Sequence, residues 1–415
     1  MPSSDAPLSD DHPLRLRQRP DFEAGGSALR LVDLFAGCGG LTLGVAQAAH
    51  AQGVALEVPL ALDFEPLALE IFQANFPKAT LHEGPVEDLF DGELGTELTS
   101  SETKTRERVG QITGLVGGPP CQGHSNLNNH TRRDDPKNAL YARMARAAEV
   151  LQPSVILIEN VPAVQHDKGG VVGIVEQHLQ GLDYDVASRV LRLDRLGVAQ
   201  TRKRHVLLAV RGLDISAMDV LAGAVTGSAD GRDLRWAIGD LESMDSRESI
   251  FDAIPRASAE NLRRLQWLLD HDKYDLPNSL RPKCHQDEHS YKSMYGRLRW
   301  EGPAQTLTSG YTSIGQGRYG HPSQPRALTA HEAARIQGFP DYFDFGRALR
   351  RTALSTMIGN AVPPALASEL FRPLIESMRR SAPQPTHIEK TVHPDTSALP
   401  SSVNVSSNRL KSSAA

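Results

Sequence analysis

The 415-residue sequence has few cysteines and no long apolar run. Its three cysteines, Cys38, Cys121 and Cys284, are spaced too widely for a disulfide framework or a zinc-binding pattern. No stretch approaches the roughly 20 apolar residues that cross a bilayer. The polar, proline-containing residues 1–23 do not have the form of a secretory signal. These absences predict a soluble, cytoplasmic protein without a metal site and without a membrane partner.

An excess of charge of one sign is also lacking. The 45 Lys and Arg and 50 Asp and Glu leave a net charge of −5. A nucleic-acid partner is not excluded, because phosphate binding depends on local charge. Residues 281–326 carry seven Lys or Arg and three Asp or Glu, and residues 183–211 carry seven Lys or Arg and three Asp. Two phosphate-binding surfaces or two ordinary solvated surfaces would both give this pattern, so charge alone does not decide.

Alternating strand-like and helix-like segments fill the first half of the chain. Hydrophobic residues make up 40% of the sequence, enough for a sizeable core. Short apolar runs at residues 29–35, 58–64, 155–158 and 205–210 alternate with stretches of helical spacing. This order predicts a doubly wound, mainly parallel α/β sheet of Rossmann-like form, with ligands at the carboxyl ends of its strands.

The alternation fades after about residue 212, which predicts a division into five parts. They are a flexible N-terminal arm (1–28), the α/β domain (29–212), a smaller irregular domain (213–325), a C-terminal segment that returns to the α/β domain (326–380) and a disordered tail (381–415).

Two segments of the α/β domain are typical of nucleotide binding. Residues 33–40, Asp-Leu-Phe-Ala-Gly-Cys-Gly-Gly, lead from a strand into a glycine-rich turn. Such glycines let a ligand approach the backbone, but they lack the G-x-G-x-x-G spacing, and a plain tight turn remains open. Asp63 and Phe64 end the next strand. Asp63 could bind ribose hydroxyls with Phe64 stacked on adenine, or it could simply cap the following helix.

Three further segments carry groups suited to catalysis. Cys121 directly follows two prolines that fix the backbone, so it is either a nucleophile or a small buried cysteine. Glu159 follows an apolar strand, which places it beside a partner or a functional cleft. Arg202 and Arg204, two residues apart before another strand, point to one face suited to an anion or a carbonyl oxygen, with a plain surface position as the alternative.

Taken in order, these segments resemble the cytosine-5 DNA methyltransferases over about residues 29–211 and 296–375. The matching segments are residues 33–40, Asp63-Phe64, Pro-Cys-Gln at 120–122, Glu-Asn-Val at 159–161, Gln-x-Arg-x-Arg at 200–204, Arg-Ala-Leu-Thr at 326–329 with Glu332, Ala334-Arg335, Gln-Gly-Phe-Pro at 337–340 and Gly-Asn-Ala-Val-Pro at 359–363. The resemblance implies that residues 29–212 form the catalytic and cofactor-binding domain and that residues 213–325 recognise the target sequence.

The resemblance also implies a mechanism and a set of site residues. The Cys121 thiolate would attack C6 of a flipped-out cytosine, Glu159 would bind N3 and the exocyclic amine, and Arg202 and Arg204 would hold O2 and nearby backbone. C5 would then take the methyl group of S-adenosylmethionine, and an unidentified base, which could be water, would remove the C5 proton. The expected cofactor-binding residues are Phe35, Ala36, Gly37, Gly39, Gly40, Asp63, Phe64, Pro119 and Asn360. Residues 122–138 would close over the site.

Two positions depart from the family pattern. His124 stands where the family usually has Phe, and Gly84-Pro85-Val86 stands where it usually has Gly-Asp-Ile, which removes the acid that meets the adenine amino group. The expected partner is double-stranded DNA. The compact layout resembles a bacterial modification enzyme, monomeric and nucleoid-associated, either solitary or paired with a restriction endonuclease.

Three alternatives remain at this stage: a tRNA cytosine methyltransferase on the same scaffold, a non-catalytic DNA-binding regulator and a nicotinamide oxidoreductase. The roughly 85-residue variable region favours a DNA reader over a tRNA enzyme. The complete set of catalytic residues argues against the regulator, and the missing G-x-G-x-x-G against the oxidoreductase. The recognition sequence cannot be predicted, because base readout depends on contact geometry.

Overall fold

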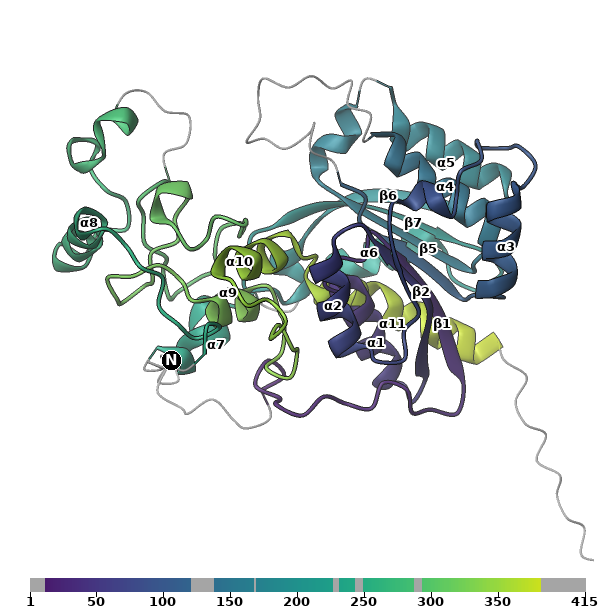
Figure 1. Ribbon diagram of the computed structural model, residues 1–415, viewed down its shortest axis with the longest axis horizontal. Coiled ribbons are helices and arrows are strands. Elements are labelled where there is room, and N and C mark those ends of the chain that lie inside the picture. Colours follow the sequence, from purple (N-terminus) through teal and green to yellow (C-terminus); the bar gives the residue numbers. More distant parts are fainter. Residues whose placement is uncertain are drawn as a thin grey trace, which may run out of the picture. The chain divides into compact units, whose positions relative to one another are not determined.

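A computed structural model describes residues 12–120, 138–167, 169–226, 231–242, 249–286 and 293–381 (Figure 1). The chain up to Ser381 forms one compact unit. Within the described ranges, seven strands form one sheet in the order β3-β2-β1-β4-β5-β7-β6. The strands are β1 (Ala28–Leu34), β2 (Ala55–Asp63), β3 (Leu81–Glu83), β4 (Gly114–Gly117), β5 (Val155–Asn160), β6 (Asp185–Arg192) and β7 (Lys203–Val210). In these same ranges we find no helix with the length and apolar character of a membrane span.

Helices cover both faces of the sheet (Figure 1). The α-helices are α1 (Gly40–His50), α2 (Pro66–Asn75), α3 (Ser100–Val109), α4 (Asn138–Leu151), α5 (Val171–Gly181), α6 (Ala217–Thr226), α7 (Leu234–Ile238), α8 (Ala259–Asp270), α9 (Ala330–Ile336), α10 (Arg351–Asn360) and α11 (Pro364–Ser381). The short 3-10 helices are η1 (Val86–Asp88), η3 (Pro162–His166), η4 (Leu193–Leu196), η5 (Gly239–Leu241), η6 (Asn278–Leu280), η7 (Lys283–His285) and η8 (Ile314–Gln316).

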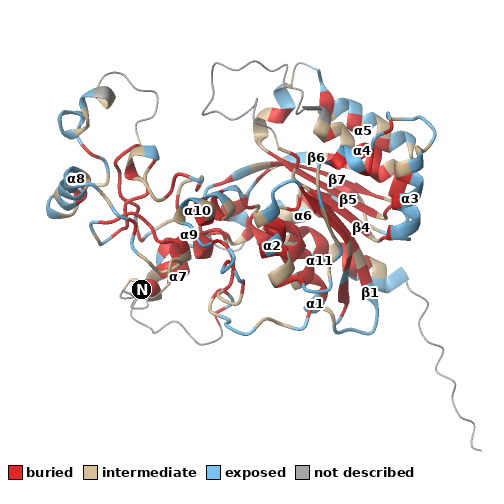
Figure 2. Cartoon of the chain, in the orientation of Figure 1, coloured by how far each residue is buried: buried red, intermediate tan, exposed pale blue. Residues whose placement is uncertain are grey.

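The alternation of side chains along the strands explains the layers. Leu31 on β1 and Val116 on β4 belong to the core packed by α1, α6 and α11, whereas Val32 and Leu115 belong to the core packed by α4 and α5. Successive side chains of a strand point to opposite faces of the sheet, so a continuous apolar run places side chains in the cores on both faces. Figure 2 shows the resulting buried sheet between partly exposed helices.

The prediction of a doubly wound, mainly parallel sheet is confirmed. Strands β3, β2, β1, β4 and β5 are parallel, and β7 lies antiparallel to both β5 and β6. Strand β6 was missed by the sequence analysis because it is an edge strand with exposed polar positions, and its apolar pattern is correspondingly weak.

The described part of the stretch expected as a flexible arm, residues 12–27, lies packed against the rest of the unit. The backbone N–H of Leu56 on β2 donates to Phe22 O at 2.7 Å, and the N–H of Asp341 donates to Leu14 O at 2.9 Å. Leu14 and Phe22 are both buried. These two apolar side chains give the segment an anchor at each end.

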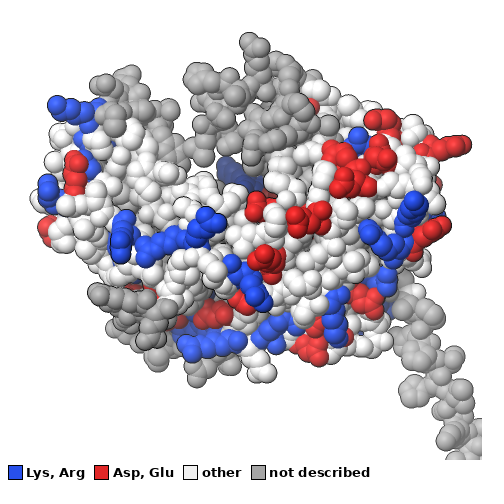
Figure 3. Space-filling model, viewed as in Figure 1, with Lys and Arg blue, Asp and Glu red and all other residues white. Residues whose placement is uncertain are grey.

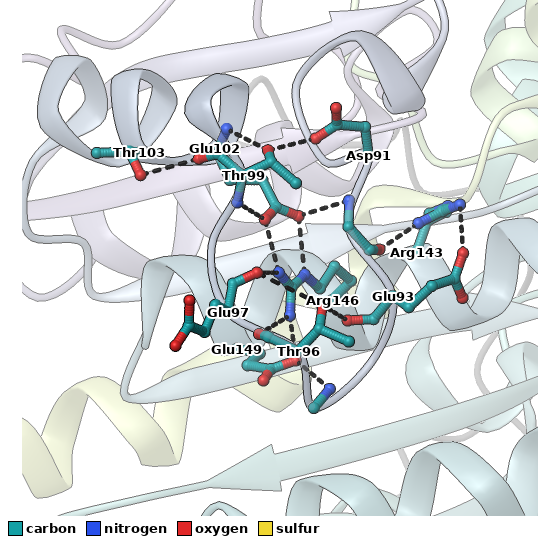
Figure 4. A network of polar contacts seen from close by, with 12 residues as sticks. Asp91, Glu93, Thr96, Glu97, Thr99, Glu102, Thr103, Arg143, Arg146 and Glu149 are labelled. Atoms are coloured by element: carbon teal, nitrogen blue, oxygen red, sulfur yellow. Dashed lines mark hydrogen bonds and ion pairs between the residues drawn. The ribbon is translucent and has the colours of Figure 1, made fainter.

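A buried ion pair joins α4 to the first turn of α3 (Figure 4). Both side chains are almost fully inaccessible, and Arg146 donates to Glu102 from Nε at 2.8 Å and from Nη2 at 2.6 Å. Glu102 also accepts from the backbone of Thr99 and Gly92, and it completes a capping box with Thr99 at the start of α3. Burial raises the pKa of Glu102, but these donors outweigh burial and hold it below the ordinary value.

Candidate active site

The glycine-rich turn after β1 has the strained backbone that its sequence predicts. Phe35, Gly37 and Gly39 have φ angles of 59°, 53° and 95°. Gly40 begins α1 so close to the chain after α10 that a Cβ would lie 2.2 Å from Val362 O. Only glycine fits there, and α1 therefore packs directly on the Asn-Ala-Val-Pro segment.

Asp63 at the end of β2 holds this turn in place. Its Oδ2 accepts from Gly37 N at 2.8 Å and its Oδ1 from Glu65 N at 3.0 Å. Burial raises the pKa of Asp63, and the backbone donors oppose that shift. Both oxygens are therefore engaged with the backbone, whereas the neighbouring Phe64 ring is 67% exposed and available for stacking.

Cys38 within the turn is not a candidate nucleophile. It is buried, and burial raises its pKa to about 12. A thiol with that pKa carries almost no thiolate at neutral pH.

The ends of β5 and β7 bring a carboxylate and a guanidinium together. Glu159 Oε1 forms an ion pair with Arg204 Nε, and Glu159 Oε2 lies beside Gly118, where a Cβ would be 3.1 Å away. The next residue, Asn160, donates from Nδ2 to Pro119 O at 3.1 Å. Asn160 therefore fixes the Pro-Pro turn that leads to Cys121, next to the Glu159 carboxylate.

Arg202 takes part in a closed ring of buried hydrogen bonds. Its Nη1 donates to Leu307 O at 3.0 Å and to Gly359 O at 3.3 Å. The Gln200 side chain accepts a hydrogen bond from Leu307 N at 2.9 Å and donates one to Gln337 Oε1 at 2.9 Å. Gln337 Nε2 in turn donates to Ile358 O at 2.6 Å and to Gly359 O at 3.5 Å, which closes the ring. Burial, with Arg204 nearby, lowers the pKa of Arg202 well below its ordinary value. The ring ties the last turn of α10 to the chain between η4 and β7.

These elements enclose one cavity of about 450 Å³. Of the residues expected from the sequence, it is lined by Phe35, Ala36, Gly37, Gly40, Asp63, Phe64, Pro119, Glu159, Arg202, Arg204 and Asn360. Gly39 does not line it and packs instead toward Phe72 and Phe76. Cys121, His124 and the expected closing loop lie outside the described residues, although Pro120, directly before Cys121, lines the cavity.

The cavity has an aromatic end and a charged end. Phe35 and Phe64 line it beside the glycine-rich turn, while Glu159, Arg202 and Arg204 line it at the ends of β5 and β7. A volume of this size is that of a small-molecule site with a few placed polar groups. The arrangement suits a nucleoside-like ligand next to a second, polar ring.

Comparison with known proteins identifies the family. The family model for C-5 cytosine-specific DNA methylases matches residues 29–376. The chain belongs to this family. It is 43% identical to the Type II methyltransferase M1.BsuMI of Bacillus subtilis, over 87% of this chain and 83% of that protein. It is 31% identical to the Type II methylase M.HgiDII of Herpetosiphon aurantiacus, over 84% of this chain and 95% of that protein.

Solved structures agree with the fold. A proposed DNA modification methyltransferase encoded within a prophage of E. coli superposes with a TM-score of 0.58 at 26% identity, over 85% of this chain and 99% of that one. This likeness confirms the expected Rossmann-like methyltransferase sheet.

In this C-5 cytosine-specific DNA methylase, several cavity residues are not among the site residues predicted individually from the sequence, although Cys38, Pro120, Asn160, Val161, Ala361 and Val362 lie in the segments that match the family. They are Cys38, Leu41, Glu65, Ala68, Gly118, Pro120, Asn160, Val161, Thr356, Met357, Ala361 and Val362. Asn160 had a signal, since an amide next to Glu159 at a strand end is placed for hydrogen bonding. Thr356 and Met357 had none, because only the packing of α10 brings them to the cavity.

Proposed function

We propose that the enzyme transfers the methyl group of S-adenosylmethionine to C5 of a cytosine flipped out of duplex DNA, through a covalent bond between Cys121 and C6. The single observation that carries the proposal is the shared cavity. One end holds the glycine-rich turn and an exposed aromatic ring, and the other holds Glu159 and Arg204 beside the turn that leads to Cys121.

The residues that line the cavity suit the cofactor chemically. Phe64 offers an exposed ring face for adenine, and the turn after β1 offers backbone N–H groups at the start of α1. Asp63 contributes by shaping that turn, because its oxygens already accept from Gly37 and Glu65. Glu65 lines the same cavity, is exposed, and supplies a second carboxylate for ribose hydroxyls. When bound, S-adenosylmethionine supplies the electrophilic methyl group.

The chain's own residues supply the activation of cytosine. Cys121 adds to C6, and the electron density that this addition releases makes C5 nucleophilic. Glu159 would share a proton with N3 and accept from the exocyclic amine, and Arg204, which forms an ion pair with Glu159, would stabilise charge on the ring. Arg202 is bonded to backbone on two sides, so its main contribution is to hold the cavity wall. Loss of the C5 proton to a base then allows elimination of the thiolate.

Residues 213–325 are proposed to recognise the target sequence. Part of this stretch has a small core of its own, formed by Leu265, Leu268, Leu276, Met294, Tyr295 and Ile314 together with Ala327. Helix α6, at the start of the stretch, packs instead in the core against the sheet. The similarity to Type II enzymes supports a bacterial modification role, with a cognate restriction endonuclease as the expected companion.

The test is methyl transfer from labelled S-adenosylmethionine to unmethylated duplex DNA, followed by bisulfite sequencing. We expect label at C5 of cytosine within one short sequence. Cys121→Ser should abolish transfer and leave DNA binding intact. Transfer to RNA alone would contradict the DNA assignment, and unchanged transfer by Cys121→Ser would contradict the covalent mechanism.

A further inference from the structure

A second cleft, of about 490 Å³, lies at the start of α10. It is lined by Pro255, Arg256, Thr312, Arg351 and Thr352. Two guanidinium groups and two hydroxyl groups line it, and no carboxylate does so among the described residues. Arg256 is exposed, and no ion pair joins it to another described side chain. The lining therefore suits an anion.

The backbone adds to this positive potential. Arg351 and Thr352 are the first two residues of the ten-residue helix α10, whose N-cap, Arg350, forms no side-chain capping bond and whose first turn contains no acidic residue. The first N–H groups of a helix have no partner within it and carry partial positive charge. Figure 3 shows Lys and Arg side chains in a band on this face, over the part of the molecule where Figure 1 draws α9 and α10.

A buried hydroxyl behind the cleft is an independent sign of a ligand. Tyr311 is fully buried, and its hydroxyl has no hydrogen-bond partner among the described residues. Tyr311 lines a small cavity of about 10 Å³ that shares Pro255, Thr312 and Arg351 with the cleft. That volume is about the room one water needs, so a water there would connect the Tyr311 hydroxyl to an oxyanion in the cleft. Burial raises the pKa of Tyr311, which keeps the hydroxyl protonated as a donor.

Helix α10 connects this cleft to the candidate active site. Arg351 and Thr352 line the cleft, and Thr356, Met357 and Asn360 line the active-site cavity. Along the helix, at 1.5 Å per residue, Thr352 lies about 6 Å from Thr356 and about 12 Å from Asn360. Each DNA strand carries one phosphate per 3.4 Å of helix axis, so a strand that follows α10 would have about two to four nucleotides between the cleft and the cavity.

We propose that this cleft binds one backbone phosphate of the DNA substrate, about two to four nucleotides from the target cytosine. The phosphate oxygens accept hydrogen bonds from Arg256, Arg351 and the first N–H groups of α10, with Tyr311 contributing through water. The inference rests on the proposed function, since it names a contact of the same substrate. Free phosphate has the same chemistry, and the position of α10 between the two sites favours the phosphate of DNA.

The first test is the salt dependence of DNA binding by the full-length enzyme and by Arg256→Gln. Each phosphate contact contributes about −0.9 to the slope of log K against log salt concentration. Arg256→Gln should lower the magnitude of the slope by about that amount, which corresponds to about a 3.5-fold smaller loss of affinity between 50 and 200 mM salt. Arg106→Gln, which removes an equal charge from the exposed surface of α3, is the control and should leave the slope unchanged.

The second test locates the phosphate with duplexes that carry one neutral methylphosphonate linkage. At one position, about two to four nucleotides from the cytosine, the neutral linkage should weaken DNA binding by the wild type as much as the Arg256→Gln substitution does. The same linkage should not weaken DNA binding by Arg256→Gln any further. Tyr311→Phe should show a smaller effect at the same position. The absence of coupling at every position would overturn the proposal.

Inorganic phosphate separates the two possible sources. If phosphate raises the melting temperature of the wild type but not of Arg256→Gln, while no linkage in DNA couples to Arg256, the cleft binds free phosphate and the DNA assignment is wrong. Methyl transfer by the wild type, measured on the same preparation, tests the proposed function separately. Normal transfer without coupling would refute this inference alone.

Discussion

Replacing Glu102 with glutamine should destabilise the enzyme far more than its isosteric shape suggests. Glu102 accepts two hydrogen bonds from Arg146 and one each from Thr99 N and Gly92 N (Figure 4). A glutamine amide has one acceptor oxygen, and its NH₂ group would face donors. Arg146 would then remain buried, with its charge offset only by Glu149 at 3.0 Å and by two backbone carbonyls.

The expected loss of stability follows from the buried charge of Arg146, which would lose its main partner. Breaking one side of a buried pair costs about 3–5 kcal/mol, and the remaining partners of Arg146 place Glu102→Gln near the lower end, at about 3 kcal/mol. Each kcal/mol of lost stability lowers the melting temperature of a larger domain by roughly 2 °C, the lower end of the usual range, so the melting temperature should fall by about 6 °C. The exposed pair of Arg372 and Glu369 supplies the control, and Glu369→Gln should cost less than about 1 kcal/mol.

Calorimetry or thermal unfolding at pH 7 measures both variants. The pKa of Glu102 lies below its ordinary value of 4.5, so its contribution is present above that pH and is lost as the pH falls through the lower, folded-state pKa. Glu102→Gln should therefore also weaken the acid dependence of stability below pH 4.5. An equal, small effect of Glu102→Gln and Glu369→Gln would refute the conclusion that this buried pair anchors α4.

Three further substitutions test the site and its supports. Burial raises the pKa of Asp33 to about 7 from an ordinary 3.8, so between these pH values the folded chain holds a proton that the unfolded chain has released. The free energy of unfolding therefore falls as the pH rises through this range. Asp33→Asn should remove that fall, which melting temperatures at pH 5 and pH 8 would measure. Gly40→Ala would place a Cβ 2.2 Å from Val362 O and should abolish cofactor binding. The control Gly173→Ala on α5, where a Cβ would meet open space, should bind the cofactor normally. Isothermal titration of the cofactor into each variant makes the comparison. Phe64→Ala should raise the KM for S-adenosylmethionine about tenfold with little change in melting temperature, since the ring is 67% exposed; an unchanged KM would rule out stacking on this ring.

Most of the parallel half of the fold was predictable because β1, β2, β4 and β5 are short apolar runs that are largely buried. Strand β6 and helix α3 were not predicted. Both are rich in exposed polar residues, and their positions depend on packing against distant elements. Helix α3 did carry a local signal, the Thr99-Ser-Ser-Glu102 capping box, which a search for helix starts would find.

The residues of the site were easier to predict than their partners. Glu159 lies at the end of β5 and Arg204 at the start of its antiparallel neighbour β7, so their meeting follows from the topology of the sheet. Asp63 had two readings from sequence, a ribose ligand or a cap, and its hydrogen bonds to Gly37 and Glu65 favour a role in shaping the turn. Arg202 looked equivalent to Arg204 in sequence. Its contacts with backbone more than 100 residues away could not be inferred without the fold.

The ring around Arg202 explains why glutamine rather than glutamate stands at position 200. Gln200 accepts from Leu307 N and donates to Gln337, which in turn donates to Ile358 O, so each amide must offer one acceptor and one donor in a fixed order. A carboxylate at 200 would set two oxygens against each other in a fully buried position. It would also place a negative charge in a fully buried position. The amide polarity of this ring therefore fixes the end of α10, and with it Asn360, against the strand ends that hold Glu159 and Arg204.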